Sequence, residues 1–252
     1  MEALGQWAEL SVFELTLAAL VVFAAGVVRG FSGFALSALT VASLALIIPP
    51  VQLIPVCWVL EMTASLLMVR GGVRDWDRHI VVGLVGGGLL GWPIGLALTT
   101  TLPVETSKAL ALCVILALAV LQLARVRLAA LATTAGLWIS GLTAGLASGL
   151  AMVGGMVVAL YVLSQDRDAR VMRGSLVMYL FIGSVFALVW LVGFGVFDGT
   201  ALRRGLVLAP VVALGVLAGR ALFRPSLERY YKPFCLVLLM ALAGWGLVRL
   251  AA

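Results

Sequence analysis

The stretch Gly26-Val-Val-Arg29-Gly30-Phe31-Ser32-Gly33-Phe34 decides how this chain folds, because it lies in the middle of an apolar run that extends over residues 12–48. A continuous helix over that run would be roughly 55 Å long, well beyond the ~30 Å hydrocarbon core of a bilayer. The run therefore predicts a helix break, and the glycines mark its place. A second overlong run, residues 131–163, contains a similar cluster: Gly141, Gly145, Gly149, Gly154 and Gly155.

The rest of the chain is equally apolar. Hydrophobic residues make up 63% of the 252 positions and charged residues 11%, and the mean hydropathy is +1.19. In an ordinary soluble domain, roughly half of the residues are hydrophobic and roughly a quarter are charged. Within lipid, every backbone polar group must be paired internally, and long runs without alternation favour helices over a β-barrel. The composition predicts an all-α polytopic membrane protein.

Loop charges indicate how the overlong runs cross the membrane. If each run forms two arms, full or re-entrant, and the acidic N-terminus lies outside, most Arg and Lys residues collect on one side. The other side keeps only Lys108, Arg203, Arg204 and Arg249. The positive-inside rule expects this asymmetry. We therefore expect a multi-pass protein of a bacterial-type inner membrane with both termini on the non-cytoplasmic side.

Paired arms give each half five segments, an odd number, so the second half starts on the opposite side from the first. We predict two inverted-topology repeats, residues 1–128 and 129–252, each with a broken or re-entrant helix pair followed by three transmembrane helices. Features recur in the same order in both halves, such as Gly87/Gly91 and Gly215/Gly219. This design is typical of secondary transporters, whose site lies at the midplane between the breaks.

The first break has the chemistry of an anion site. Unwinding frees backbone N–H groups, and a following half-helix points its positive end into the gap. Arg29 adds a charge and a planar fork of donors that suits a sulfonate or carboxylate. Alternatively, Arg29 snorkels to the interface at the tip of the hairpin. The candidate binding residues of this break are Arg29, Gly30, Phe31, Ser32 and Gly33.

The second break carries no charge, and its candidate binding residues are Ser148 and Gly149. Its glycine spacing is also the small-xxx-small pattern of close helix packing, which stays an equal alternative. Gly87, Gly91 and Gly95 are expected to serve packing alone. On the run over residues 171–197, Tyr179 and Arg173 could complete a polar lining, with snorkelling as the alternative for Arg173.

Glu61 is the only acid well inside an apolar run, residues 51–69. An ionised, unpaired carboxylate there costs several kcal/mol, so it should be protonated, paired or facing water. Two interpretations stay open. Glu61 carries a proton that couples transport, or it is structural, as an ion pair with Arg29 or as a neutral acid bonded to a neighbouring helix.

Enzymatic patterns are missing from the sequence. His79 is the only histidine, so neither a metal triad nor a Ser-His-Asp set can form around it. We expect no enzyme, no cofactor and no metal. The net charge of +6 is spread over short loops, so nucleic acid is not expected either. The expected partners are a small anionic substrate and membrane lipid, with a homodimer left open.

With Gly30-Phe31-Ser32-Gly33-Phe34 in one half and the glycine series from Gly141 to Gly155, followed by Tyr161, in the other, the chain resembles the sulfite exporter TauE/SafE family over nearly its whole length. The resemblance implies a carrier of sulfite, sulfoacetate or other organosulfonates, with the proton gradient as an optional driving force. Ala35, Leu36 and Ser37 stand where further glycines are common in the family. The alternatives are a passive anion channel and a non-transporting membrane assembly protein.

Overall fold

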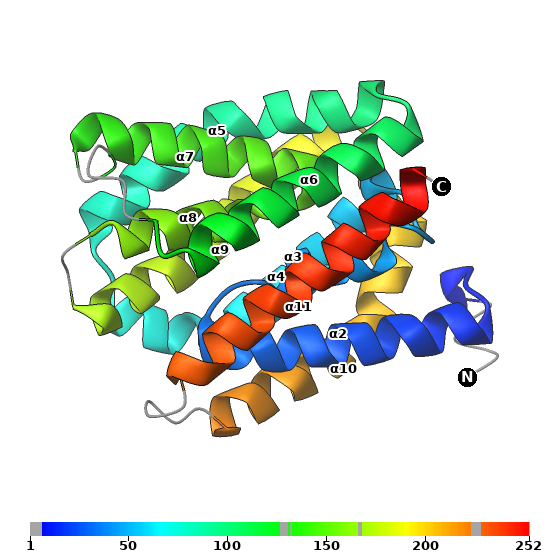
Figure 1. Cartoon of the computed structure of the whole chain (residues 1–252), viewed down its shortest axis with the longest axis horizontal. Coiled ribbons are helices and arrows are strands. Elements are labelled where there is room, and N and C mark those ends of the chain that lie inside the picture. The colour runs from blue at the N-terminus through cyan, green and yellow to red at the C-terminus, as the bar shows by residue number, and fades with distance from the viewer. Residues whose placement is uncertain (1–6, 127–130, 132, 166–167, 223–227, 252) are drawn as a thin grey trace.

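The computed structural model describes residues 7–126, 131, 133–165, 168–222 and 228–251. The predicted boundary between the repeats, at residues 128 and 129, lies outside them. Figure 1 shows the described residues as one helical bundle, with ten α-helices and no strand in this part of the chain. The helices are α2 (Val12–Ser32), α3 (Leu36–Leu44), α4 (Pro50–Asp75), α5 (Arg78–Thr101), α6 (Val104–Leu123), α7 (Thr134–Ala151), α8 (Gly154–Leu163), α9 (Ala169–Gly193), α10 (Gly199–Leu222) and α11 (Glu228–Ala251).

Seven of these helices are long and apolar enough to cross a membrane: α2, α4, α5, α6, α9, α10 and α11. Large apolar side chains also cover the outside of the bundle, where Leu20, Leu90 and Val189 are each more than half exposed. Water is a poor solvent for such a surface, whereas lipid tails are a good one. The chain is therefore a multi-pass membrane protein.

The first overlong run is divided between α2 and α3 by a segment that we call the first interruption, residues 33–35. Gly33 ends α2 in the left-handed conformation, with φ of 83°, and its N–H donates to the Arg29 carbonyl at 2.9 Å. Ala35 precedes α3 and is also left-handed, with φ of 74°. These two residues, separated only by Phe34, reverse the chain, so that the nine-residue α3 packs back against α2.

The second overlong run is divided between α7 and α8 by the second interruption, residues 152 and 153. Met152 takes the left-handed conformation, with φ of 58°, and α8 begins at Gly154. The N–H of Met152 donates to the Ser148 carbonyl at 2.7 Å. Residues other than glycine are uncommon in the left-handed conformation, so the surrounding packing must hold Met152 in this turn.

Most of the glycines expected to break the helices instead lie within them. Gly26 and Gly30 are inside α2 and face α10, where a Cβ on Gly26 would lie 2.9 Å from the Val212 carbonyl oxygen. Gly141, Gly145 and Gly149 are inside α7 and face α5. Close approach of two backbones through small residues stabilises helix pairs in lipid. The packing alternative therefore describes Gly141, Gly145 and Gly149, and Gly26 and Gly30 make the same kind of close helix contact, which the sequence did not predict.

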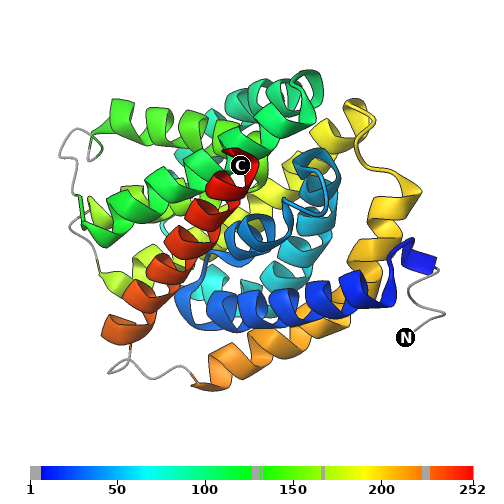
Figure 2. The same ribbon diagram turned by 45° about the vertical axis from the view of Figure 1, so that its right-hand side comes forward.

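The long helices pair in a regular way: α2 with α10, α5 with α7, α4 with α9, and α6 with α11. Figures 1 and 2 show α2 and α10 side by side along one face of the bundle, and α5 and α7 along the opposite face. One buried apolar cluster includes residues from all ten helices. Arg29 and Glu61 lie within this core.

Candidate functional site

A buried ion pair joins the end of α2 to the middle of α4. The Arg29 side chain is fully buried, and its Nε lies 3.3 Å from Oε2 of Glu61, which is 4% exposed. Two charges taken out of water need good geometry to offset their desolvation, and removing one partner of such a pair typically costs about 3–5 kcal/mol. The predicted ion pair of Glu61 with Arg29 is present, and a role of Glu61 in proton coupling stays a prediction.

The Glu61 carboxylate lies at the amino end of α3. The Ser37 hydroxyl donates to Oε1 of Glu61 at 2.9 Å, and the backbone N–H of Ser37 donates to the same oxygen at 3.4 Å. Ser37 is the second residue of α3, so its N–H is among those without an intrahelical acceptor. The positive end of the helix dipole also favours a negative group here. Glu61 therefore fills the position that the sequence analysis assigned to an external anion.

The pair is incompletely hydrogen-bonded. Nη2 of Arg29 donates to the Ser65 hydroxyl at 3.2 Å, but within the described residues Nη1 of Arg29 and Oε2 of Glu61 have no hydrogen-bond partner. A guanidinium carries five donors in a fixed fork. The guanidinium thus has donor capacity without an acceptor among the described residues, which a second anionic or polar acceptor would satisfy.

A small central cavity of about 20 Å³ lies on the other side of Glu61. Its polar lining is Glu61, Ser148, Tyr179 and Ser184, and the side chains of Ser148 and Tyr179 hydrogen-bond to each other. This volume holds about one water molecule. The cavity brings Glu61 of the first half together with Ser148 of α7 and Tyr179 of α9, beside the second interruption.

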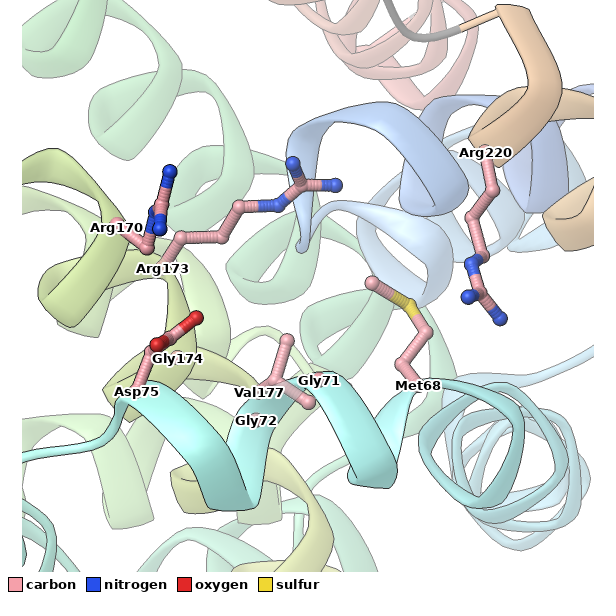
Figure 3. A pocket seen from close by; sticks show the side chains of 9 residues that line it. All are labelled: Met68, Gly71, Gly72, Asp75, Arg170, Arg173, Gly174, Val177 and Arg220. Carbon is pink, nitrogen blue, oxygen red and sulfur yellow. The ribbon is translucent and has the colours of Figure 1, made fainter.

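Two larger cavities lie toward the two ends of the bundle. The basic-end cavity, about 300 Å³, has Met68, Asp75, Arg170, Arg173 and Arg220 among its lining residues (Figure 3). The terminal-end cavity, about 370 Å³, is lined in part by Glu9, Gln52, Pro55, Asp198 and Arg204.

Helix α4 lines all three cavities. Pro55 borders the terminal-end cavity, Glu61 the central one and Met68 the basic-end one. At 1.5 Å per residue, Glu61 is about 9 Å from Pro55 and about 10 Å from Met68 along the helix. The paired helix α9 borders the basic-end and central cavities, and residues just after it border the third. The α4–α9 pair thus borders a larger cavity near each end and a small one between them.

The remaining predicted site residues lie apart from the ion pair. Nη2 of Arg173 donates to the Gly30 carbonyl at 3.1 Å, where a cation suits the negative end of α2. Ser32 closes the first interruption, because its hydroxyl donates to the Val28 carbonyl at 2.8 Å and accepts from the Phe34 N–H at 3.3 Å. Phe31 is partly buried against the apolar core.

The predicted site residues that are glycines serve the backbone turn or the contacts between helices. Gly33 shapes the turn, whereas Gly30 and Gly149 lie in helix contacts, against α10 and α5 respectively. None of the three is among the residues that line the cavities described above.

Two partners of the ion pair were not among the predicted site residues. Ser65 lies four residues after Glu61, on the same face of α4, and that spacing could have identified it. Ser37 precedes Glu61 by 24 residues, so only the reversal at the first interruption brings it there. In the described part of the chain, no group of three or more His, Cys, Asp or Glu residues is placed to hold a metal ion.

Comparison with known proteins gives one match. The family model of the sulfite exporter TauE/SafE family matches residues 18–245, which covers both interruptions and all three cavities except for Glu9. No curated protein and no solved structure matches the chain significantly.

Proposed function

The chain belongs to the sulfite exporter TauE/SafE family, and from that premise we propose that it is a secondary transporter of small sulfur-containing anions, such as sulfite, sulfoacetate or other organosulfonates. The observation that carries this proposal is the series of three cavities along α4 and α9, with a buried Arg29–Glu61 pair at the narrow centre. A transporter needs a site that two opposite vestibules can reach in turn, and this series supplies the parts.

We assign the two halves as inverted repeats, α2–α6 and α7–α11. The support is reciprocal pairing: the first helix of each half packs against the fourth helix of the other, as α2 with α10 and α7 with α5. The third elements, α4 and α9, pair with each other, and so do the fifth, α6 and α11. Two repeats related by a two-fold axis in the membrane plane would pair in this reciprocal way, with the α4–α9 contact on the axis.

We place the protein in the inner membrane with its basic end toward the cytoplasm. The basic-end cavity joins the end of α4 to the start of α9 and the end of α10. Arg70, Arg74, Arg78, Arg170 and Arg220 belong to these helix ends and the adjoining start of α5. Figure 1 shows the start of α2 and the end of α11 together at the other end. The positive-inside rule then puts both on the non-cytoplasmic side.

In the proposed mechanism, an anion takes the position of the Glu61 carboxylate. Arg29 and the amino end of α3 attract one negative group, and Glu61 now supplies it. A second negative group in the same buried space would repel the first strongly. Glu61 must therefore take up a proton before an anion can bind Arg29, so that one proton accompanies each anion bound.

Transport into proteoliposomes tests the function. Purified protein should accumulate labelled sulfoacetate when a pH gradient is imposed, and a protonophore should abolish that accumulation. Glu61→Gln should lose proton-driven accumulation while retaining exchange of anion across the membrane. Equilibration without accumulation in both proteins would instead favour a passive channel. No anion flux at all would overturn the transporter proposal and favour the assembly protein.

A further inference from the structure

The basic-end cavity has features that the Arg29 site lacks. Its described lining includes three arginines and one aspartate, which together carry a formal charge of about +2 at neutral pH. Among the described residues, no ion pair within 4 Å joins Asp75 to Arg170 or Arg220. A volume of about 300 Å³ is at the lower end of the range for small-molecule sites. The cavity therefore has both the room and the charge for a small dianion.

Hydrogen bonds to helix carbonyls hold two of the arginines in place. Nη1 of Arg220, at the end of α10, donates to the Leu67 carbonyl of α4 at 2.8 Å. Nη2 of Arg173, on α9, donates to the Gly30 carbonyl of α2 at 3.1 Å. Each bond fixes a guanidinium relative to a neighbouring helix, which lowers the entropy lost when a ligand binds.

The charges are spread across the cavity. Figure 3 shows Arg170 and Arg220 on opposite sides, with Arg173 reaching between them and Met68 nearer to Arg220. Met68 and Val177 are buried and give this cavity an apolar floor. An anion with a single charged centre would meet only part of this lining. A ligand with two anionic groups joined by a short apolar spacer would match both sides and the floor.

We propose that the basic-end cavity is a second anion site, separate from Arg29, which takes dianions whose two anionic groups are separated by a short carbon spacer. Arg170 and Arg173 bind one anionic group, and Arg220 binds the other. Asp75, which stands on the Arg170 side in Figure 3, disfavours a third anionic group there. This proposal rests on the proposed function only in taking the ligand to be a transported anion, because binding to this cavity is measurable without transport.

The test compares ligands that differ in their second group. The full chain, in nanodiscs of zwitterionic lipid, is titrated with sulfoacetate, methanesulfonate and taurine by calorimetry. Arg170→Gln/Arg220→Gln should weaken sulfoacetate binding roughly tenfold or more, since two charge-assisted contacts are lost. Binding of methanesulfonate, which has one anionic group, should change less than about twofold. Taurine, whose second group is cationic, should bind less tightly than sulfoacetate to the unmodified protein.

Arg74→Gln is the matched control, because Arg74 lies on the exposed end of α4 and outside the cavity lining. It removes the same charge from the same end of the molecule and should leave sulfoacetate binding unchanged. Arg220→Lys keeps the charge and should retain part of the affinity. Circular dichroism of each variant establishes that a lost affinity is not lost folding.

Three results would overturn the proposal. The double variant could keep its affinity for sulfoacetate. It could also lose affinity for sulfoacetate and methanesulfonate equally, which would mean that the cavity does not recognise the second anionic group. Alternatively, phosphatidylglycerol in the nanodisc could displace sulfoacetate from the unmodified protein, which would make a lipid headgroup the occupant. Failure of transport in proteoliposomes with intact sulfoacetate binding would refute the proposed function and leave this site standing.

Discussion

The two interruptions share a backbone plan but differ in chemistry. Each follows a long helix, turns through a left-handed residue and starts a short helix that packs back on the long one. The first half contributes the charged Arg29 and Glu61, whereas the second half contributes the neutral Ser148 and Tyr179 to the central cavity. The difference teaches that similar turn geometry at the two interruptions does not bring similar charge with it. One half supplies the electrostatics, and the other closes the central cavity around it.

The largest effect is expected at the charged interruption. Glu61→Leu leaves a buried guanidinium that cannot lose its proton, so the free energy of unfolding should fall by about 3–5 kcal/mol. Arg29→Met should cost less, because the remaining Glu61 can become neutral by binding a proton. Thermal unfolding in detergent measures both. The double variant Arg29→Met/Glu61→Leu should regain most of the loss, and simple addition of the two single effects would contradict a coupled pair.

The glycine contacts should give smaller effects that are similar in the two halves. Gly30→Ala places a Cβ against the Val216 carbonyl of α10, and Gly145→Ala places one against the Gly88 carbonyl of α5. Such overpacking typically costs about 1–3 kcal/mol, read from the same thermal unfolding. Gly244→Ala in α11, where nothing lies within 4 Å, is the control. It should stabilise by up to about 1 kcal/mol through helix propensity, and an equal loss at all three positions would contradict the packing role.

The smallest effect is expected at the neutral interruption. Tyr179→Phe or Ser148→Ala removes one partner of a hydrogen bond between neutral groups, which contributes about 1 kcal/mol. Sulfoacetate uptake should be slowed much less than by Glu61→Gln. If Tyr179→Phe instead abolished proton-driven uptake, the chemistry would not belong to one half, and the contrast between the interruptions would fail.

The fold class was predictable because lipid imposes strong rules. Length and hydropathy alone require helices, and an overlong run requires a division. The exact place was not predictable from glycine content, since Gly26 and Gly141 serve helix packing while Ala35 and Met152 adopt the left-handed turns. Glycine permits both roles, and only the neighbouring helix decides between them.

The sequence singled out Arg29 and Glu61 but not their arrangement, and their roles in anion binding and proton coupling stay predictions. Arg29 and Glu61 stood out because charge inside an apolar run is costly, and the structure pairs them. The contact of Glu61 with the amino end of α3 depends on the chain reversal, which no local pattern encodes. Likewise, the cavity around Arg170, Arg173 and Arg220 forms from loop-end charges on two helices that pack against α4, far apart in the sequence.

The most direct test of the central claim, that an anion binds Arg29 only when Glu61 carries a proton, is the affinity for methanesulfonate measured from about pH 6 to about pH 8. Methanesulfonate stays a monoanion throughout this pH range, and the surrounding arginines stay charged. In the unmodified protein, affinity should fall as pH rises, approaching tenfold per pH unit once Glu61 is ionised. In Glu61→Gln the affinity should stay flat and high. A fall of equal slope in both proteins, or a flat profile in the unmodified one, would contradict the account.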